Sequence, residues 1–378
     1  MIKDTPLNTQ ILNDESRLLV IPVKNSISST VMAIVKAGPR YDPPGLEGTS
    51  HFVEHMLFRG TEKFPTNKEL TMELEKNGAI AEAFSYYETN RYWVRGPKEA
   101  INISIENLID RIYHPLFKKE DVEFEKGVIL EERNILFSNP EKLIWEIWNQ
   151  TLWTENQLGR YYLGSEKNIR SLKREDLINY FKKHYVGPSI FYIVAGDFEK
   201  EKIAEIFNSL IEKRRVDNKI QQSPLHTLIV RKNKRVNSFN IQTETINISL
   251  GFSTVPKGHE DEHTLDLMST IFGGGMGSRL RRSVMEPGYT YSIETHTEYL
   301  SDTGYFLINF TTEKKNLEKV LKAVYENFDR LKNEPVKKLD LDHAKGFFSG
   351  QLKINTETTY DLSMFYSSQV FSNSDEII

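Results

Sequence analysis

The stretch that most constrains the fold is residues 51–55, which read His-Phe-Val-Glu-His. In a helix, side chains four residues apart share one face, so His51 and His55 can direct two imidazoles at one position. Glu54 borders the same face, where it can take a proton from water. The turn-forming residues 45–50 predict a helix start just before the motif. The pattern predicts a zinc site, because catalytic zinc takes three protein ligands and keeps one open position; the alternative is a helix whose histidines face solvent.

A second predicted helix, over residues 118–138, can supply the third ligand. Glu125 and Glu132 are seven residues apart, which is about two helical turns, so they share a face. Glu131 points about 100° away from Glu132. One carboxylate of the shared face could bind zinc, and the other could support the site from behind. Taken alone, the pattern favours a solvated acidic face, so these residues leave the third ligand open.

Several stretches around these motifs match one family pattern. They are Gly-Pro-Arg-Tyr at 38–41, Gly-Leu-Glu-Gly at 45–48, His-Phe-Val-Glu-His-Met-Leu-Phe-Arg-Gly-Thr at 51–61, Ala-Phe-Ser at 83–85, Glu-Thr at 88–89, Leu-Gly at 158–159 and 163–164, and Ala-Gly-Asp-Phe at 195–198. With them the chain resembles the pitrilysin/insulinase family of inverzincin zinc metallopeptidases, in particular bacterial members similar to mitochondrial processing peptidase. The resemblance extends over nearly the whole chain.

The resemblance implies a zinc endopeptidase and gives each site residue a role. The family spacing selects Glu132 over Glu131 as third ligand beside His51 and His55, so Zn²⁺ is the expected cofactor. Glu54 is then the general base, and Glu125 the supporting carboxylate of the catalytic site.

The resemblance also implies a strand that pairs with an extended peptide substrate. Glu82, Ala83 and Phe84 are the expected substrate-binding residues of that strand. Main-chain pairing tolerates many sequences, so weak side-chain selectivity is expected. Glu82 stands where the family usually has Asn, which could alter the preferred substrate charge.

A second substrate-binding element is expected in the latter half of the chain. The family commonly has an arginine and a tyrosine there, and Tyr291 matches the tyrosine. Met285 occupies the arginine position, with the spacing one residue short. Arg282, or its neighbour Arg281, could take the place of the missing arginine.

The order of predicted elements indicates an α+β fold with two similar halves. Each half has strand pairs followed by helices, which predicts a mostly antiparallel sheet with helices packed on one face. We expect a zinc-bearing catalytic domain over residues 1–215 and a similar, metal-free domain over 225–378, joined by a polar linker at 213–224. The second half ends before counterparts of the last elements of the first, so it is expected to be C-terminally truncated.

The individual elements follow the periodicity of apolar residues. In the first half we predict strands near 18–23, 30–35, 79–86, 90–96 and 190–195, and helices near 49–59, 67–77, 99–113, 118–138, 141–153, 168–184 and 199–214. In the second half we predict strands near 226–231, 239–252, 289–298 and 303–312, and helices near 260–272, 277–285, 315–333, 336–354 and 358–372.

Composition argues against several other classes. The chain has 378 residues, a net charge of −4 and no long basic run, which argues against a nucleic-acid partner. Mean hydropathy is −0.48 and no apolar run is long enough to span a membrane, so no membrane partner is expected. Cysteine is absent, so the chain has no disulfides and gives no redox clue. The first residues have no apolar signal core, which leaves the cytoplasm as the default expected location.

Three functions remain open at this point. The first is a zinc endopeptidase that hydrolyses peptides or unfolded, extended protein segments in a chamber between the domains. The second is a metal-binding but poorly active subunit of a heteromeric peptidase assembly. The third is a chance motif in an unrelated fold, such as a cofactor enzyme. For either peptidase function we expect a homodimer or a heterodimer with a related subunit.

Overall fold

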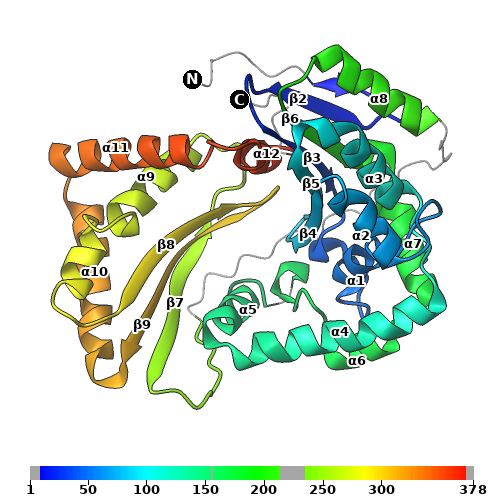
Figure 1. Ribbon diagram of the computed structural model, residues 1–378. Helices are drawn as coiled ribbons and strands as arrows, with labels where there is room; N and C mark the ends of the chain where they lie inside the picture. The colour runs from blue at the N-terminus through cyan, green and yellow to red at the C-terminus, as the bar shows by residue number, and fades with distance from the viewer. Residues whose placement is uncertain (1–8, 155, 213–234, 372–378) are drawn as a thin grey trace. The chain divides into compact units, whose positions relative to one another are not determined.

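A computed structural model describes residues 9–154, 156–212 and 235–371. These residues pack into two compact units, and the chain passes between them more than once (Figure 1). Unit 1 holds the described residues up to 134, then 160–212 and 355–371, and unit 2 holds those within 135–159 and 235–354. No helix in the described part of the chain is long and apolar enough to cross a membrane.

Unit 1 is built on a six-stranded, mostly antiparallel sheet with the strand order β1-β2-β6-β3-β5-β4. Its strands are β1 (Gln10–Ile11), β2 (Arg17–Pro22), β3 (Ser28–Val35), β4 (Ile80–Tyr86), β5 (Thr89–Pro97) and β6 (Ile190–Gly196). The pair β2–β6 is parallel, and the other pairs are antiparallel. β4 is therefore an edge strand of the sheet that the described residues form.

A layer of helices covers one face of this sheet. They are α1 (Thr49–Met56), α2 (Asn67–Glu75), α3 (Ile101–Tyr113), α4 (Lys119–Ser138), α6 (Glu166–Ser171), α7 (Arg174–His184) and α8 (Lys200–Glu212). Alternate strand residues such as Val31, Ala33 and Tyr192 pack against this layer. α8 meets them with Ile203, Phe207 and Ile211, four residues apart, as an amphipathic helix requires.

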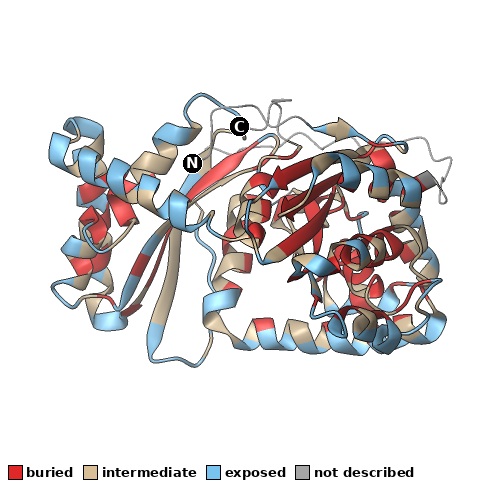
Figure 2. Ribbon diagram, turned by 45° about the horizontal axis from the view of Figure 1, so that its top comes forward, coloured by how far each residue is buried: buried red, intermediate tan, exposed pale blue. Residues whose placement is uncertain are grey.

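The opposite face of the same sheet is also buried, by α12 (Thr359–Ser367) near the end of the described chain. The intervening strand residues, such as Met32, Ile34 and Ile193, pack there against Tyr366 and Val370. Figure 2 shows the resulting burial along the central strands. Burial on both faces explains why β3 and β6 read as continuous apolar runs rather than as alternating patterns.

Unit 2 has a three-stranded antiparallel sheet with the order β7-β9-β8. Its elements are β7 (Thr245–Thr254), α9 (Glu262–Gly273), the π-helical turn η5 (Arg281–Met285), β8 (Ser292–Tyr299), β9 (Gly304–Glu313), α10 (Leu317–Asn333) and α11 (Lys338–Ile354). One face packs Phe306, Ile308 and Phe310 of β9 against α9, η5 and α10.

The other face of this second sheet receives α5 (Pro140–Leu152), which precedes it by about a hundred residues in sequence. The indole rings of Trp148 and Trp153 lie edge-on to Tyr305 of β9, with centroids 5.9 and 5.7 Å away. Gly251 of β7 leaves room for this packing, because a Cβ there would stand 2.8 Å from the ring of Trp148. Each unit is thus completed by a helix from the other half of the sequence.

The predicted class, α+β with two sheet-and-helix halves, is confirmed. The units nevertheless differ from the expected domain ranges 1–215 and 225–378, because α5 and α12 pack with the opposite half. The expected helix 168–184 is divided into α6 and α7 at Leu172. The expected linker at 213–224 and strand at 226–231 lie outside the described residues.

Candidate active site

The helix that carries the histidine motif is anchored at its start by a buried aspartate. The carboxylate of Asp42 accepts hydrogen bonds from the backbone N–H groups of Gly48 and Ser50, at 2.7 and 2.8 Å. Burial raises the pKa of Asp42 to about 7. Gly48 is the N-cap with φ of 97°, and a Cβ there would lie 2.5 Å from the carbonyl oxygen of Leu163. The predicted turn and helix start are present, and the carboxylate of Asp42, which was given no role from the sequence, binds N–H groups at the start of the helix.

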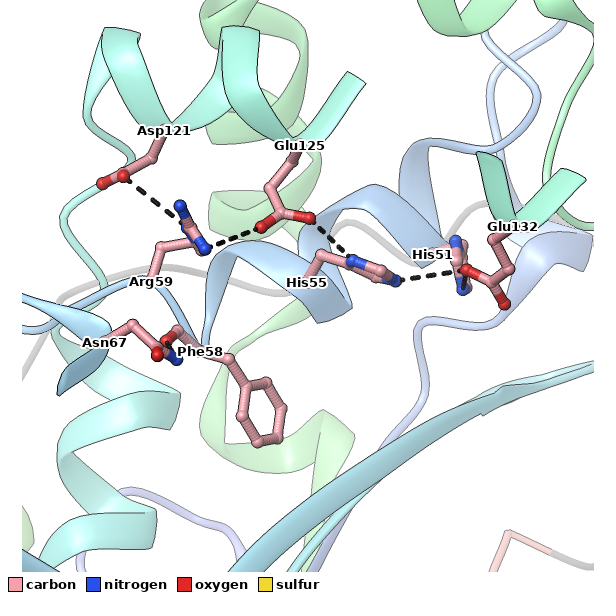
Figure 3. Close-up of polar contacts among 8 residues, drawn as sticks. All are labelled: His51, His55, Phe58, Arg59, Asn67, Asp121, Glu125 and Glu132. Atoms are coloured by element: carbon pink, nitrogen blue, oxygen red, sulfur yellow. Dashed lines mark hydrogen bonds and ion pairs between the residues drawn. The ribbon is translucent and has the colours of Figure 1, made fainter. Parts of the chain in front are cut away.

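Helices α1 and α4 bring His51, His55 and Glu132 together (Figure 3). One potential ligand atom from each lies within 4.8 Å of the others. The Oε2 atom of Glu132 is 3.6 Å from Nε2 of both His51 and His55. Glu131, one residue earlier, is exposed and outside this group.

These donors fit a zinc ion. Zinc prefers imidazole nitrogen and carboxylate oxygen at about 2.0–2.2 Å in a tetrahedral arrangement, which puts neighbouring donors roughly 3.3–3.6 Å apart. The 3.6 Å separations from Glu132 agree with that spacing. Three protein donors leave one tetrahedral position for water or substrate.

The two imidazoles differ in charge state, because both are buried but only His55 has carboxylate contacts that outweigh the burial. It lowers the pKa of His51 to about 3, helped by the neighbouring His55, so this ring is neutral and can offer a lone pair. Burial also opposes charge on His55, but the hydrogen bond to Glu125 and the nearby carboxylate of Glu132 outweigh it and raise its pKa to about 9. A metal ion at His55 therefore has to displace a proton from this ring.

Glu54 lies beside the metal donors, outside the group that could hold the ion. Its side chain is buried, and Ser85 of β4 donates a 2.5 Å hydrogen bond to Oε2. Burial raises the pKa of Glu54 to about 7, against the lowering effect of the Ser85 hydroxyl. A carboxylate that titrates near neutrality is suited to accept and then release a proton.

Glu125 lies behind His55 and not at the metal position (Figure 3). Its Oε2 atom is 2.9 Å from Nδ1 of His55, so the carboxylate can hold the ring with Nε2 turned toward Glu132. Carboxylate–histidine pairs of this kind fix the tautomer and raise the basicity of a ligand.

The predicted substrate residues of β4 lie on the edge strand beside Glu54. Glu82 is exposed, and Ala83 points to the helical face, where it packs against the main core. Phe84 points to the opposite face and packs with Trp93. The alternation puts Ala81, Ala83 and Ser85 on the face of α1, which is how Ser85 reaches Glu54.

Tyr291 and Arg282 belong to unit 2. Tyr291 is 90% exposed, in the turn before β8. Arg282 lies in η5 and forms an ion pair of 3.4 Å with Asp340, which Arg279 also binds at 2.9 Å. The group around His51 belongs to unit 1.

Three side chains that contact the site were given no role from the sequence. Ser85 binds Glu54, the ring of Tyr162 lies edge-on to His51 at 5.6 Å, and Arg59 binds Glu125. The alternation of side chains along the strand could have predicted the position of Ser85, because it places Ser85 on the same face as Ala81 and Ala83. The spacing of Arg59, four residues after His55, was a weaker indication that Arg59 lies near the site.

Comparison with known families accounts for both halves of the chain. Residues 19–166 match the model described as Insulinase (Peptidase family M16), and residues 171–346 match the model described as Peptidase M16 inactive domain. The chain belongs to the M16 peptidase family. The predicted resemblance is confirmed, and the histidine motif lies in the first of the two matched segments.

Relatives of this M16 chain include named zinc proteases. An uncharacterized zinc protease of Rickettsia bellii is 28% identical over 93% of this chain and 83% of its own length. The mitochondrial-processing peptidase subunit beta of Homo sapiens is 25% identical over 85% of this chain and 68% of its own length. These names support a peptidase, and the group of His51, His55 and Glu132 could hold a metal.

The M16 fold is also found among solved structures. The crystal structure of a protease from Helicobacter pylori has a TM-score of 0.88 at 18% identity, and the match covers 98% of this chain and 91% of that one. At this identity the likeness shows the fold alone.

Proposed function

We propose that this chain is a zinc-dependent endopeptidase that hydrolyses peptides or extended, unfolded protein segments. The observation that carries the proposal is the convergence of His51, His55 and Glu132, with Glu54 beside them. The family membership and the names of the relatives support it.

In the proposed reaction, a zinc ion bound by these ligands supplies Lewis-acid activation of water and of the scissile carbonyl. Glu54 takes one proton from the attacking water while the water oxygen bonds to the carbonyl carbon. Glu54 then delivers that proton to the amide nitrogen as the C–N bond breaks. Ser85 keeps the Glu54 carboxylate in position through its hydrogen bond.

Substrate binding in this proposal uses the edge of β4. An extended peptide can pair its main chain with this edge, beside Glu82, Ala83 and Phe84, as an added strand. Main-chain pairing demands an extended conformation and little of the sequence, so unfolded segments are the proposed substrate class. Tyr291 and Arg282 remain predicted substrate-binding residues, although Asp340 already engages Arg282.

The test is digestion of an unfolded protein and of a peptide mixture by the purified chain, with fragments identified by mass spectrometry. Zinc content after dialysis is measured on the same preparation. We expect one zinc per chain, cleavage at many sequences, and loss of cleavage with a chelator that zinc restores. Cleavage that persists without metal would reject the proposal.

The second candidate is a metal-binding, poorly active subunit of a heteromeric peptidase. Met285 stands at the family's arginine position and Arg282 is held by Asp340, which favours a partner that supplies the missing group. One relative is itself named as a subunit, the beta subunit of mitochondrial-processing peptidase. A chain that binds zinc but cleaves only after a related subunit is added would support this candidate. Homodimerisation and the cytoplasmic location stay predictions, testable by light scattering and cell fractionation.

A further inference from the structure

Arg59 reaches from the turn after α1 to the same helix that provides the third metal donor. Its Nη1 atom is 3.2 Å from Oε1 of Glu125, and its Nε atom is 3.6 Å from Asp121, one helical turn before Glu125. The guanidinium lies over the ring of Phe124, 4.4 Å from the ring centre. Figure 3 shows the resulting row of contacts from Asp121 through Arg59 and Glu125 to His55.

The turn that carries Arg59 is itself held in place. The backbone N–H of Arg59 donates to the carbonyl of Met56, the last residue of α1. The side-chain amide of Asn67 donates a 2.8 Å hydrogen bond to the carbonyl of Phe58. The guanidinium is therefore directed at α4 from a fixed backbone.

Glu125 needs a cation at its second oxygen. Its side chain is 5% exposed, and its two oxygens meet His55 on one side and Arg59 on the other. A buried carboxylate that loses its guanidinium partner is strongly disfavoured, so it must rotate or admit water. Each of these responses weakens its hold on Nδ1 of His55, and with it the direction of Nε2.

We propose that Arg59 is a positioning residue for the metal centre, acting on His55 through Glu125. This inference rests on the proposed zinc site and adds a residue that does not itself touch the metal. Because Arg59 acts only through Glu125, removing Arg59 should change zinc affinity little in a variant whose residue 125 can no longer hold the Nδ1–H of His55.

The test is a set of zinc dissociation constants for the full chain, measured by competition with a chromophoric chelator. We expect Arg59→Met to weaken zinc binding about 10–100-fold, the usual effect of losing a group that supports a metal ligand. Arg59→Lys should keep part of the affinity, because an ammonium can meet the Glu125 oxygen but lacks the planar guanidinium that faces both Glu125 and Asp121. The matched control is Lys126→Met, which removes a cation beside Glu125 that pairs instead with Glu123. It should leave the affinity unchanged.

A double-mutant cycle separates positioning from general destabilisation. In the Glu125→Gln background, Arg59→Met should cost less than about twofold further affinity. Full additivity of the two losses, or wild-type affinity in Arg59→Met, overturns the inference. Visible spectra of the cobalt-substituted chain give a second readout, and Arg59→Met should alter the cobalt bands while Lys126→Met does not.

If the unaltered chain binds no zinc, the proposed function fails first. If it binds zinc and only the Arg59 variants behave as wild type, the inference alone fails.

Discussion

At the scale of single residues, Glu54 has a raised pKa and a fixed side-chain position. It is buried, which raises its pKa to about 7, and the Ser85 hydroxyl fixes one of its oxygens at 2.5 Å. A fixed carboxylate next to the metal donors, but not among them, is the arrangement expected of a general base. Its loss should therefore separate turnover from metal binding.

Glu54→Gln is expected to reduce peptidase turnover by about 10²–10⁴-fold, because the amide keeps the shape but cannot accept the proton. Zinc content should stay at the wild-type value. Turnover on a fluorogenic peptide and zinc by atomic absorption are the two measurements. Wild-type turnover in this variant would remove Glu54 from the mechanism.

A second residue-scale prediction concerns the adjacent acids of α4. Glu132→Gln should weaken zinc binding by at least about 100-fold, because a neutral amide replaces an anionic ligand. Glu131→Gln is the matched control, since this side chain is exposed and lies outside the donor group. Its zinc affinity should equal that of wild type. A larger loss in Glu131→Gln would mean that the ligand has been assigned to the wrong acid.

At the scale of elements, the geometry of the site depends on where α1 begins. Gly48 has a left-handed backbone, and its Cα faces the chain at Leu163, so both the conformation and the space require glycine. Gly45 has φ of 84°, but a methyl group added to it would meet no atom within 4 Å, which makes it a matched control for backbone strain alone.

Gly48→Ala is expected to lower the free energy of unfolding by roughly 2–4 kcal/mol, whereas Gly45→Ala costs about 1–2 kcal/mol from the backbone strain. Urea denaturation of both variants measures the difference. Zinc affinity should fall only in Gly48→Ala, because the start of α1 moves. Equal losses in the two variants would show that the approach to Leu163 is unimportant.

The sequence was sufficient for local features and insufficient for long-range ones. The spacing of His51 and His55 predicted a shared helix face, and the family spacing predicted Glu132. The apolar runs of β3 and β6 predicted strands, but we expected helices on one face only, whereas α12 also covers the other face. The sequence of these strands does not indicate which distant segment packs on their second face, because the packing of α12 depends on tertiary contacts. Likewise, the contact of Arg59 with Glu125 depends on how α1 and α4 cross.

At the scale of the whole molecule, stability should depend on pH through His184. Its imidazole is buried at the end of α7, next to the rings of Tyr180 and Tyr41 and the carbonyl of Lys36. Burial, with a contribution from Lys183, lowers its pKa from 6.5 to about 4. The folded protein therefore keeps the ring neutral between pH 6.5 and 4, where the unfolded chain protonates it.

Because the unfolded state binds the extra proton in that window, the free energy of unfolding should fall as pH drops from 6.5 to about 4. The loss attributable to His184 is at most about 3 kcal/mol, and it stops below pH 4, where both states are protonated. His184→Gln should remove this part of the pH dependence in urea denaturation at pH 7 and pH 5. His263→Gln, with a side chain that is 90% exposed, is the control and should leave the dependence as in wild type. An unchanged slope in His184→Gln would contradict the assignment.

Because α5 and α12 each pack on the sheet of the opposite half of the sequence, the two halves should not fold when they are expressed separately. A gene cut between the two halves would encode two polypeptides that each lack the cover for one face of their own sheet. The first would expose Met32, Ile34 and Ile193, and the second would expose Tyr305 and Leu307. We expect each polypeptide to aggregate when expressed alone and the pair to complement each other when co-expressed, since each carries the helix the other needs. The two halves are alike in architecture, yet neither covers both faces of its sheet without a helix from the other.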